Sequence, residues 1–246
     1  MPALSTDNSS TDDGSSPRSE PLPRPAAVLF DMDGTLVDTE ELWWQAAVEC
    51  AAGLGLTLTE DDLPEVLGQA VEHTAAHLHR RASGTSGGTG LAELTARLDE
   101  AFASRVAAEV VPRPGALDLL GRLRAAEVPM ALVSASPRRV IDLVLATLGR
   151  DWFRTVLAAE DTPRTKPAPD PYLAAAARLG LAPAACVAVE DTPTGVASAH
   201  AAGCAVLAVP SAVPIQASDR VTVLDSLVHA DLPLLASLTA AAPGDR

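Results

Sequence analysis

Short, continuous runs of apolar residues recur along this chain and alternate with segments in which apolar residues return every three or four positions. The continuous runs predict strands buried on both faces, and the periodic segments predict amphipathic helices. Five strands are expected, at residues 26–30, 128–135, 153–160, 186–190 and 204–209. Strands that alternate with helices in this way favour an α/β fold with a doubly wound, mostly parallel, Rossmann-like sheet.

Capping residues mark the expected ends of several helices. Ser136 and Pro137 are typical of an N-cap and a first helical residue, and Gly149 ends the periodic segment that follows them. Thr192 and Pro193 begin a further, short helix in the same way. Two more helices are expected at residues 114–126 and 171–179. Most of these helices lie between two predicted strands, which is the kind of connection that parallel pairing requires.

The pattern changes between residues 39 and 112, where no buried-strand run appears. Amphipathic segments are present instead at 39–53, 60–79 and 91–111, with a Gly/Ser/Thr-rich loop at 82–90. We therefore expect a small helical cap domain inserted after the first strand. The predicted division is a core domain at 26–38 and 113–236 and a cap domain at 39–112.

The first 25 residues (1–25) are rich in Ser, Thr, Asp and Pro, which predicts a disordered tail without the basic and apolar regions of a secretory signal. The 246-residue chain carries a net charge of −14, which disfavours nonspecific binding to nucleic acid or to an anionic membrane. No apolar run is long enough to predict a membrane span. The three cysteines have no motif spacing and are interpreted as reduced thiols. We expect a cytoplasmic monomer or homodimer.

Polar side chains gather where the predicted strands end. These residues are Asp31, Asp33, Ser134, Lys166, Glu190 and Asp191. In an open parallel sheet the carboxyl ends of the strands share one edge, and ligand sites lie beyond that edge. Carboxylates brought together there repel one another unless a cation neutralises them, and a small set of oxygen ligands suits Mg²⁺. A magnesium ion, a lysine and backbone amides would form a pocket for a phosphoryl group.

Lys166 is the only lysine among the 18 basic residues of the chain, and it lies in the proline-rich stretch TPRTKPAPDPYL. Two interpretations fit this observation. A coding preference for arginine leaves an occasional lysine in a solvated loop. Alternatively, the position requires a compact ammonium beside a carboxylate and a small anion, a task for which a planar guanidinium is unsuited.

Four stretches, VLFDMDGTLVDTE, ALVSAS, RTKPAPDPYL and VAVEDTPTGVASAHAAG, resemble the four motifs of the haloacid dehalogenase-like superfamily, in order and over about residues 26–210. The helical insert resembles the cap of its phosphatase and phosphomutase branch. The resemblance implies that Asp31 is the nucleophile, that Asp33 is the general acid and base, and that Lys166 neutralises the nucleophile and the phosphoryl group. It therefore favours the functional interpretation of the single lysine.

The same resemblance implies the binding residues. Ser134 and the neighbouring amide of Ala135 would hold phosphoryl oxygens. Asp191 would bind Mg²⁺ directly, and Glu190 would act there or through water. The second oxygen of Asp31 and the backbone carbonyl of Asp33 would complete the protein ligands of the metal. The position of Trp43 in the first cap helix implies that this side chain lies near the substrate.

The activity that the resemblance implies is Mg²⁺-dependent hydrolysis of a small phosphate ester, a sugar or polyol phosphate, through an aspartyl phosphate. A β-phosphoglucomutase-like sugar phosphomutase is the main alternative. The mutase pattern has a His where this chain has Trp43, and a Lys-Asn pair where it has Pro137 and Arg138. DTEELWWQA and SASP are instead similar to bacterial hexitol and 2-deoxyglucose 6-phosphate phosphatases.

Two further alternatives rank lower. The resemblance extends to carbon–halogen hydrolases, which share the fold but lack the second Asp of the first motif. This chain has that residue, Asp33. A non-catalytic binding protein would be expected to have lost a motif residue, and none is missing. In the cap, His73 and His77 are four residues apart on an expected helix. With His79 they suggest a second metal site or, more simply, a solvated helix face.

Overall fold

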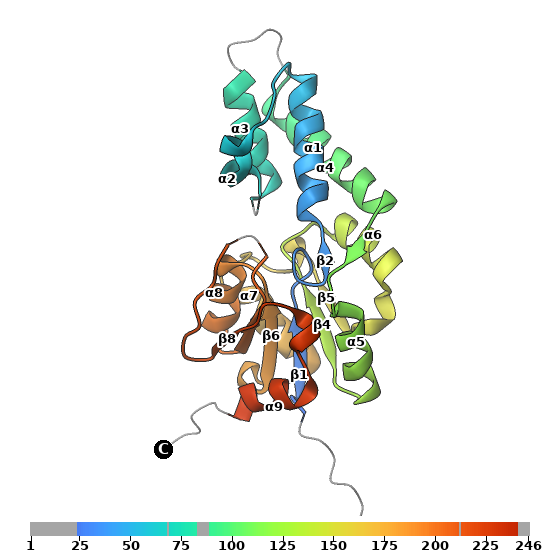
Figure 1. The fold of residues 1–246 in the computed structure, drawn as a ribbon, viewed down its shortest axis with the longest axis vertical. Coiled ribbons are helices and arrows are strands. Elements are labelled where there is room, and N and C mark those ends of the chain that lie inside the picture. The colour runs from blue at the N-terminus through green and yellow to red at the C-terminus, as the bar shows by residue number, and fades with distance from the viewer. Residues whose placement is uncertain (1–23, 68, 83–88, 212, 241–246) are drawn as a thin grey trace, which may run out of the picture.

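A computed structural model describes residues 24–67, 69–82, 89–211 and 213–240 and shows six parallel strands in one sheet (Figure 1). The strand order is β5-β4-β1-β6-β7-β8. The strands are β1 (Ala27–Phe30), β4 (Met130–Val133), β5 (Thr155–Leu157), β6 (Cys186–Glu190), β7 (Ala205–Ala208) and β8 (Val221–Val223). The prediction of a doubly wound α/β fold is thereby confirmed, whereas most of the expected disordered tail lies outside the described residues.

Helices cover both faces of the sheet, because side chains of a strand point alternately to one face and the other. Val28 and Phe30 of β1 pack into a cluster with α5 and α6, and Ala27 and Leu29 pack into a second cluster with α7 and α8. All four residues are fully buried. The covering helices are α5 (Ala116–Ala125), α6 (Arg138–Leu148), α7 (Asp170–Leu179), α8 (Pro193–Ala201) and α9 (Leu232–Ala240).

The helix ends agree with the capping signals except at the N-terminus of α6. Gly149 is the C-cap of α6, and the Thr192 side chain accepts a hydrogen bond from the Gly195 amide at 3.1 Å as the N-cap of α8. Pro137, however, is the N-cap of α6 and not its first helical residue, because its ψ of 149° is extended. Strand β8 and helix α9 were not expected from the pattern.

The described residues between β2 (Val37–Asp38) and β3 (Val111–Pro112) include four α-helices that lie beyond the carboxyl edge of the sheet (Figure 1). They are α1 (Glu40–Gly53), α2 (Leu63–Val66), α3 (Val71–Ala82) and α4 (Leu91–Ala108). The expected segment 60–79 is thus divided into two helices. The four helices share an apolar cluster of their own, and β2 pairs antiparallel with β3 where the chain leaves and re-enters the sheet region. We propose that this group is a separate cap domain with the boundaries expected from the sequence.

Over the ranges that the structure describes, no helix combines the length and the apolar character needed to cross a membrane.

Candidate active site

The centre of the sheet places two carboxylates side by side at its carboxyl edge. Phe30 of β1 is in register with Val189 of β6, and the Asp31 amide donates to the Val189 carbonyl at 2.9 Å. Asp31 therefore follows β1 at the level where Glu190 ends β6. Both are buried, with 7% of Asp31 and none of Glu190 exposed. Two ionisable groups at this depth require a charged or hydrogen-bonding partner.

Lys166 is that partner. It reaches in from the loop between β5 and α7, and its Nζ atom lies 2.5 Å from Asp31 Oδ1 and 2.6 Å from Glu190 Oε1. Burial alone would lower the pKa of Lys166, but the charges of Asp31 and Glu190 raise it above its ordinary value, so the side chain stays an ammonium. Its side chain is only 6% exposed, so the interpretation of a stray lysine in a solvated loop is wrong.

Asp191 lies next to this pair and is held by two hydroxyl groups. Thr35 Oγ1 donates to Oδ1 at 3.1 Å, and Ser211 Oγ donates to Oδ2 at 2.6 Å. Gly34 lets the loop after β1 pass close to Asp191. The φ of Gly34 is +82°, and a Cβ added to this glycine would lie 2.1 Å from Asp191 Oδ2. Burial, followed by the charge of Glu190, raises the pKa of Asp191 to about 7.

These carboxylates fit a divalent cation. One oxygen each from Asp31, Glu190 and Asp191 lies within 4.8 Å of the others, all three residues being buried. Burial raises the pKa of Asp31 well above its usual range, Lys166 lowers it, and the charges of Glu190, Asp191 and Asp33 raise it further. A single ammonium therefore leaves an excess of negative charge, which oxygen-bound Mg²⁺ would offset. Asp31 and Asp191 are the residues best disposed to hold it, because the oxygens of Glu190 already accept several hydrogen bonds.

Asp33 is surrounded by hydroxyl groups. Its Oδ1 accepts from Thr39 Oγ1 at 2.8 Å, and its Oδ2 accepts from Ser134 Oγ at 3.2 Å and from Ser136 Oγ at 2.8 Å. Ser134 is buried at the end of β4, and Ala135 is exposed in the loop that follows it. The structure thus brings the expected phosphate-binding hydroxyl to the expected general acid and base.

Trp43 lies one helical turn beyond Thr39, and its indole is used inside the cap. Nε1 donates to the Val66 carbonyl at 2.8 Å, and the ring meets Phe102 edge-on with centroids 5.1 Å apart. The indole donor is therefore occupied by the protein itself. Contact between this ring and a substrate stays a prediction.

The cap histidines pair with carboxylates of the preceding turns. His77 Nε2 lies 2.7 Å from Asp62 Oδ1, and His73 Nε2 lies 2.8 Å from Glu65 Oε2. The side chain of His77 is only 13% exposed, so the interpretation of a solvated helix face is wrong for this residue. The residue pattern does not indicate these partners, because Asp62 and Glu65 lie on a separate turn and helix.

Several residues of the site were missed by the sequence patterns. The Tyr172 hydroxyl donates to Glu190 Oε1 at 2.7 Å, and Ser211 holds Asp191. Gly195 leaves space for Glu190, because a Cβ there would lie 1.9 Å from both carboxylate oxygens. Tyr172 is the single tyrosine of the chain and lies six residues after Lys166, within the stretch RTKPAPDPYL, which is a usable signal. Ser211 has no such signal, because it follows β7 in a loop of irregular structure.

The arrangement defines a class of protein: an α/β enzyme with a lysine and buried carboxylates at the carboxyl edge of a parallel sheet, beneath a helical insert. Residues 25–203 match the family of haloacid dehalogenase-like hydrolases. The chain belongs to this family, and it is a hydrolase.

Two relatives and one crystal structure show which members of the family this chain is similar to. The chain is 36% identical over 194 residues to protein CbbY of Rhodobacter capsulatus, covering 75% of this chain and 85% of that protein. It is 36% identical over 203 residues to hexitol phosphatase A of Escherichia coli, covering 82% and 89%. The crystal structure of CbbY from Rhodobacter sphaeroides in complex with phosphate superposes with a TM-score of 0.73 at 27% identity, over 83% of this chain and 96% of that one.

Proposed function

We propose that this hydrolase is a phosphatase that cleaves a small sugar or polyol phosphate through a phosphoryl–enzyme intermediate on Asp31. The observation that carries the proposal is the buried contact of Lys166 with Asp31 and Glu190 beside the hydroxyl-bound carboxylate of Asp33. A carboxylate nucleophile needs its charge held in place but not removed by a proton, and an adjacent ammonium does this. The names of the hexitol phosphatase and of the phosphate complex of CbbY support the substrate class.

In the first step an Asp31 carboxylate oxygen attacks phosphorus, and the bond between phosphorus and the ester oxygen breaks. Asp33 gives its proton to that oxygen, so the alcohol leaves neutral. In the second step Asp33 takes a proton from water as the water oxygen attacks phosphorus. The bond to Asp31 then breaks, inorganic phosphate leaves and both carboxyl groups return to their first state. Asp33 must exchange one of its three hydroxyl contacts for the leaving oxygen or the water.

The remaining polar groups bind and orient the phosphoryl group. Ser134 and the Ala135 amide would turn to the phosphoryl oxygens, and Lys166 would offset their charge as well as that of Asp31. Asp31 and Asp191 would hold Mg²⁺, with the Asp33 carbonyl. When bound, the ion reduces the repulsion between the carboxylates and the incoming phosphoryl oxygens.

A phosphomutase is the second candidate, and two contacts weigh against it. Trp43 gives its only polar hydrogen to the Val66 carbonyl, so it offers nothing in place of the mutase histidine. Arg138 donates through Nη2 to Asp161 and to the Val156 carbonyl, so part of its guanidinium is already paired within the protein. Without these groups an intermediate on Asp31 is expected to react with water.

The test is to incubate the enzyme and Mg²⁺ with hexose 6-phosphates, hexitol phosphates and β-glucose 1-phosphate, and to follow phosphate release and isomer formation together. We expect inorganic phosphate as the product from at least one hexose or hexitol phosphate, and no isomer. Efficient conversion of β-glucose 1-phosphate to glucose 6-phosphate with little free phosphate would establish the mutase instead.

A further inference from the structure

Tyr172 of α7 contacts two members of the charged cluster at once. Its hydroxyl donates to Glu190 Oε1 at 2.7 Å, and its ring centroid lies 5.2 Å from Lys166 Nζ. The side chain is fully buried and is the largest of the completely buried side chains in the described part of the chain. A phenylalanine would fill the same volume, so packing alone does not account for the hydroxyl.

The hydrogen bonds of Glu190 show what the hydroxyl does. Oε1 accepts from Lys166 and Tyr172, and Oε2 accepts from the Asp191 amide at 3.2 Å and from Thr192 Oγ1 at 3.4 Å. A carboxylate has roughly four acceptor positions, so these four donors account for them. The close approach of Gly195 leaves the carboxylate no room to shift towards α8. Glu190 is therefore fixed in place by donors from three segments.

A fixed Glu190 matters because lysine is long and flexible. The ammonium of Lys166 bridges Glu190 and Asp31, and the face of the Tyr172 ring limits where it can go. Removing the hydroxyl leaves Oε1 with one donor and lets Glu190 and the ammonium move together, away from Asp31. An error of an ångström at this point is enough to lower the rate of a reaction that depends on alignment.

We propose that Tyr172 is a positioning residue for the nucleophile: its hydroxyl anchors Glu190, and Glu190 and the tyrosine ring together hold the Lys166 ammonium on Asp31. The effect on catalysis rests on the proposed phosphatase function, whereas the effect on the position of Lys166 does not. The two can therefore be measured separately.

The first experiment uses the fact that Lys166 is the only lysine of the chain. The folded protein is treated with an amine-acylating reagent, and modification at Lys166 is followed by peptide mass spectrometry, which separates it from the N-terminal amine. In Tyr172→Phe we expect the rate of acylation at Lys166 to rise roughly tenfold, because a buried, doubly paired ammonium reacts only after it is released.

The matched control is Thr74→Val, which removes the buried Thr74 hydroxyl that donates to the Glu65 carbonyl in the cap. It also loses the hydrogen bond of a buried hydroxyl, here to a backbone carbonyl in the cap, and should leave acylation of Lys166 unchanged. Melting temperatures of both variants show that they are folded. Equal acylation rates in Tyr172→Phe and the wild type would overturn the proposal, whatever the activity of the enzyme.

The second experiment measures steady-state hydrolysis of the best substrate. We expect Tyr172→Phe to lower kcat roughly tenfold with little change in KM, since the residue is fully buried. In a Glu190→Gln background the same substitution should add no further loss, because it acts through Glu190. Losses that multiply in the double variant, or an unchanged kcat in Tyr172→Phe, would contradict the positioning role. A wild type with no phosphatase activity would count against the proposed function alone.

Discussion

Two buried carboxylate clusters of this protein are built from similar parts and differ in how their charges balance. At the sheet edge, Asp31 and Glu190 share one ammonium, and Asp191 next to them has a pKa raised to about 7 by burial and by Glu190. In the cap, Asp62 is also buried. It contacts His77 at 2.7 Å, Arg81 at 2.5 Å and the Thr59 amide at 2.9 Å. Burial raises the pKa of Asp62, but these donors outweigh it and lower the pKa to about 2.

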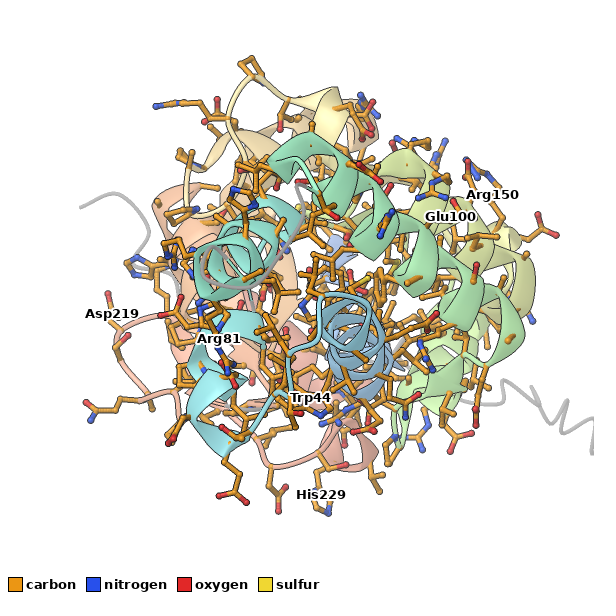
Figure 2. All side chains as sticks on the ribbon, turned by 90° about the horizontal axis from the view of Figure 1, so that it is seen from above. Trp44, Arg81, Glu100, Arg150, Asp219 and His229 are labelled. Atoms are coloured by element: carbon orange, nitrogen blue, oxygen red, sulfur yellow. The ribbon has the colours of Figure 1, made fainter. Side chains whose placement is uncertain are left out.

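The balance of charge distinguishes the cluster that stabilises the cap from the cluster at the candidate active site. Figure 2 looks down onto the cap and shows Arg81 on the side of α2 and α3, where it completes a cluster that needs nothing more. The cluster at the sheet edge has more negative groups than its lysine can balance, so a bound cation would lower its cost. Uncompensated charge, and not burial as such, marks the site.

The largest expected effect comes from Asp31→Asn, which keeps the shape of the side chain and removes its charge. Hydrolysis of the best substrate should fall by on the order of 10³-fold or more, because the nucleophile is lost. The melting temperature at neutral pH should not fall, since burial and three neighbouring carboxylates disfavour the charged form of Asp31 more than Lys166 favours it. Near-normal turnover would contradict the role of Asp31, and a large loss of stability would contradict the charge argument.

A smaller loss is expected from Lys166→Arg, which preserves the charge. Activity should fall roughly 10²-fold, because a broad planar guanidinium does not fit where an ammonium lies between Asp31 and Glu190. Arg164→Lys is the control, since it changes an exposed arginine of the same loop that pairs with Asp170. Wild-type rates in Lys166→Arg would show that the single lysine has no special task.

Asp62→Asn makes the same Asp-to-Asn change as Asp31→Asn, but in the cap cluster, where the charges are balanced. We expect stability to fall instead of activity. The activity should persist, while the free energy of unfolding at neutral pH should fall by about 2 kcal/mol, the value of a pKa lowered from 3.8 to about 2. Because the folded-state pKa lies below the unfolded one, this stabilisation is present above about pH 4 and is lost as the pH falls towards 2.

Urea unfolding of the wild type and Asp62→Asn at neutral pH and near about pH 3 measures the difference. It should shrink at the lower pH. A difference that is absent at neutral pH, or that grows on acidification, would show that the Asp62 cluster is not the stabilising one.

The sheet could be predicted because each buried strand is a local run of apolar residues, and its end fixes where Asp31 and Glu190 lie. The short strand β8 could not, since only Val221 of its three residues is buried. The break within 60–79 was missed because both halves keep an apolar face. Hydrogen-bond partners that only the tertiary fold brings together could not be predicted either. Ser211 donates a hydrogen bond to Asp191, which lies 20 positions earlier in the chain, and no local sequence pattern predicts this pair.

Titration of chelator-treated protein with Mg²⁺ by calorimetry tests the central claim that the sheet-edge cluster needs a cation and the cap cluster does not. We expect one binding event in the wild type, its loss in Asp191→Asn, and unchanged binding in Asp62→Asn. Absence of binding by the wild type, or binding that survives in Asp191→Asn and disappears in Asp62→Asn, would contradict it.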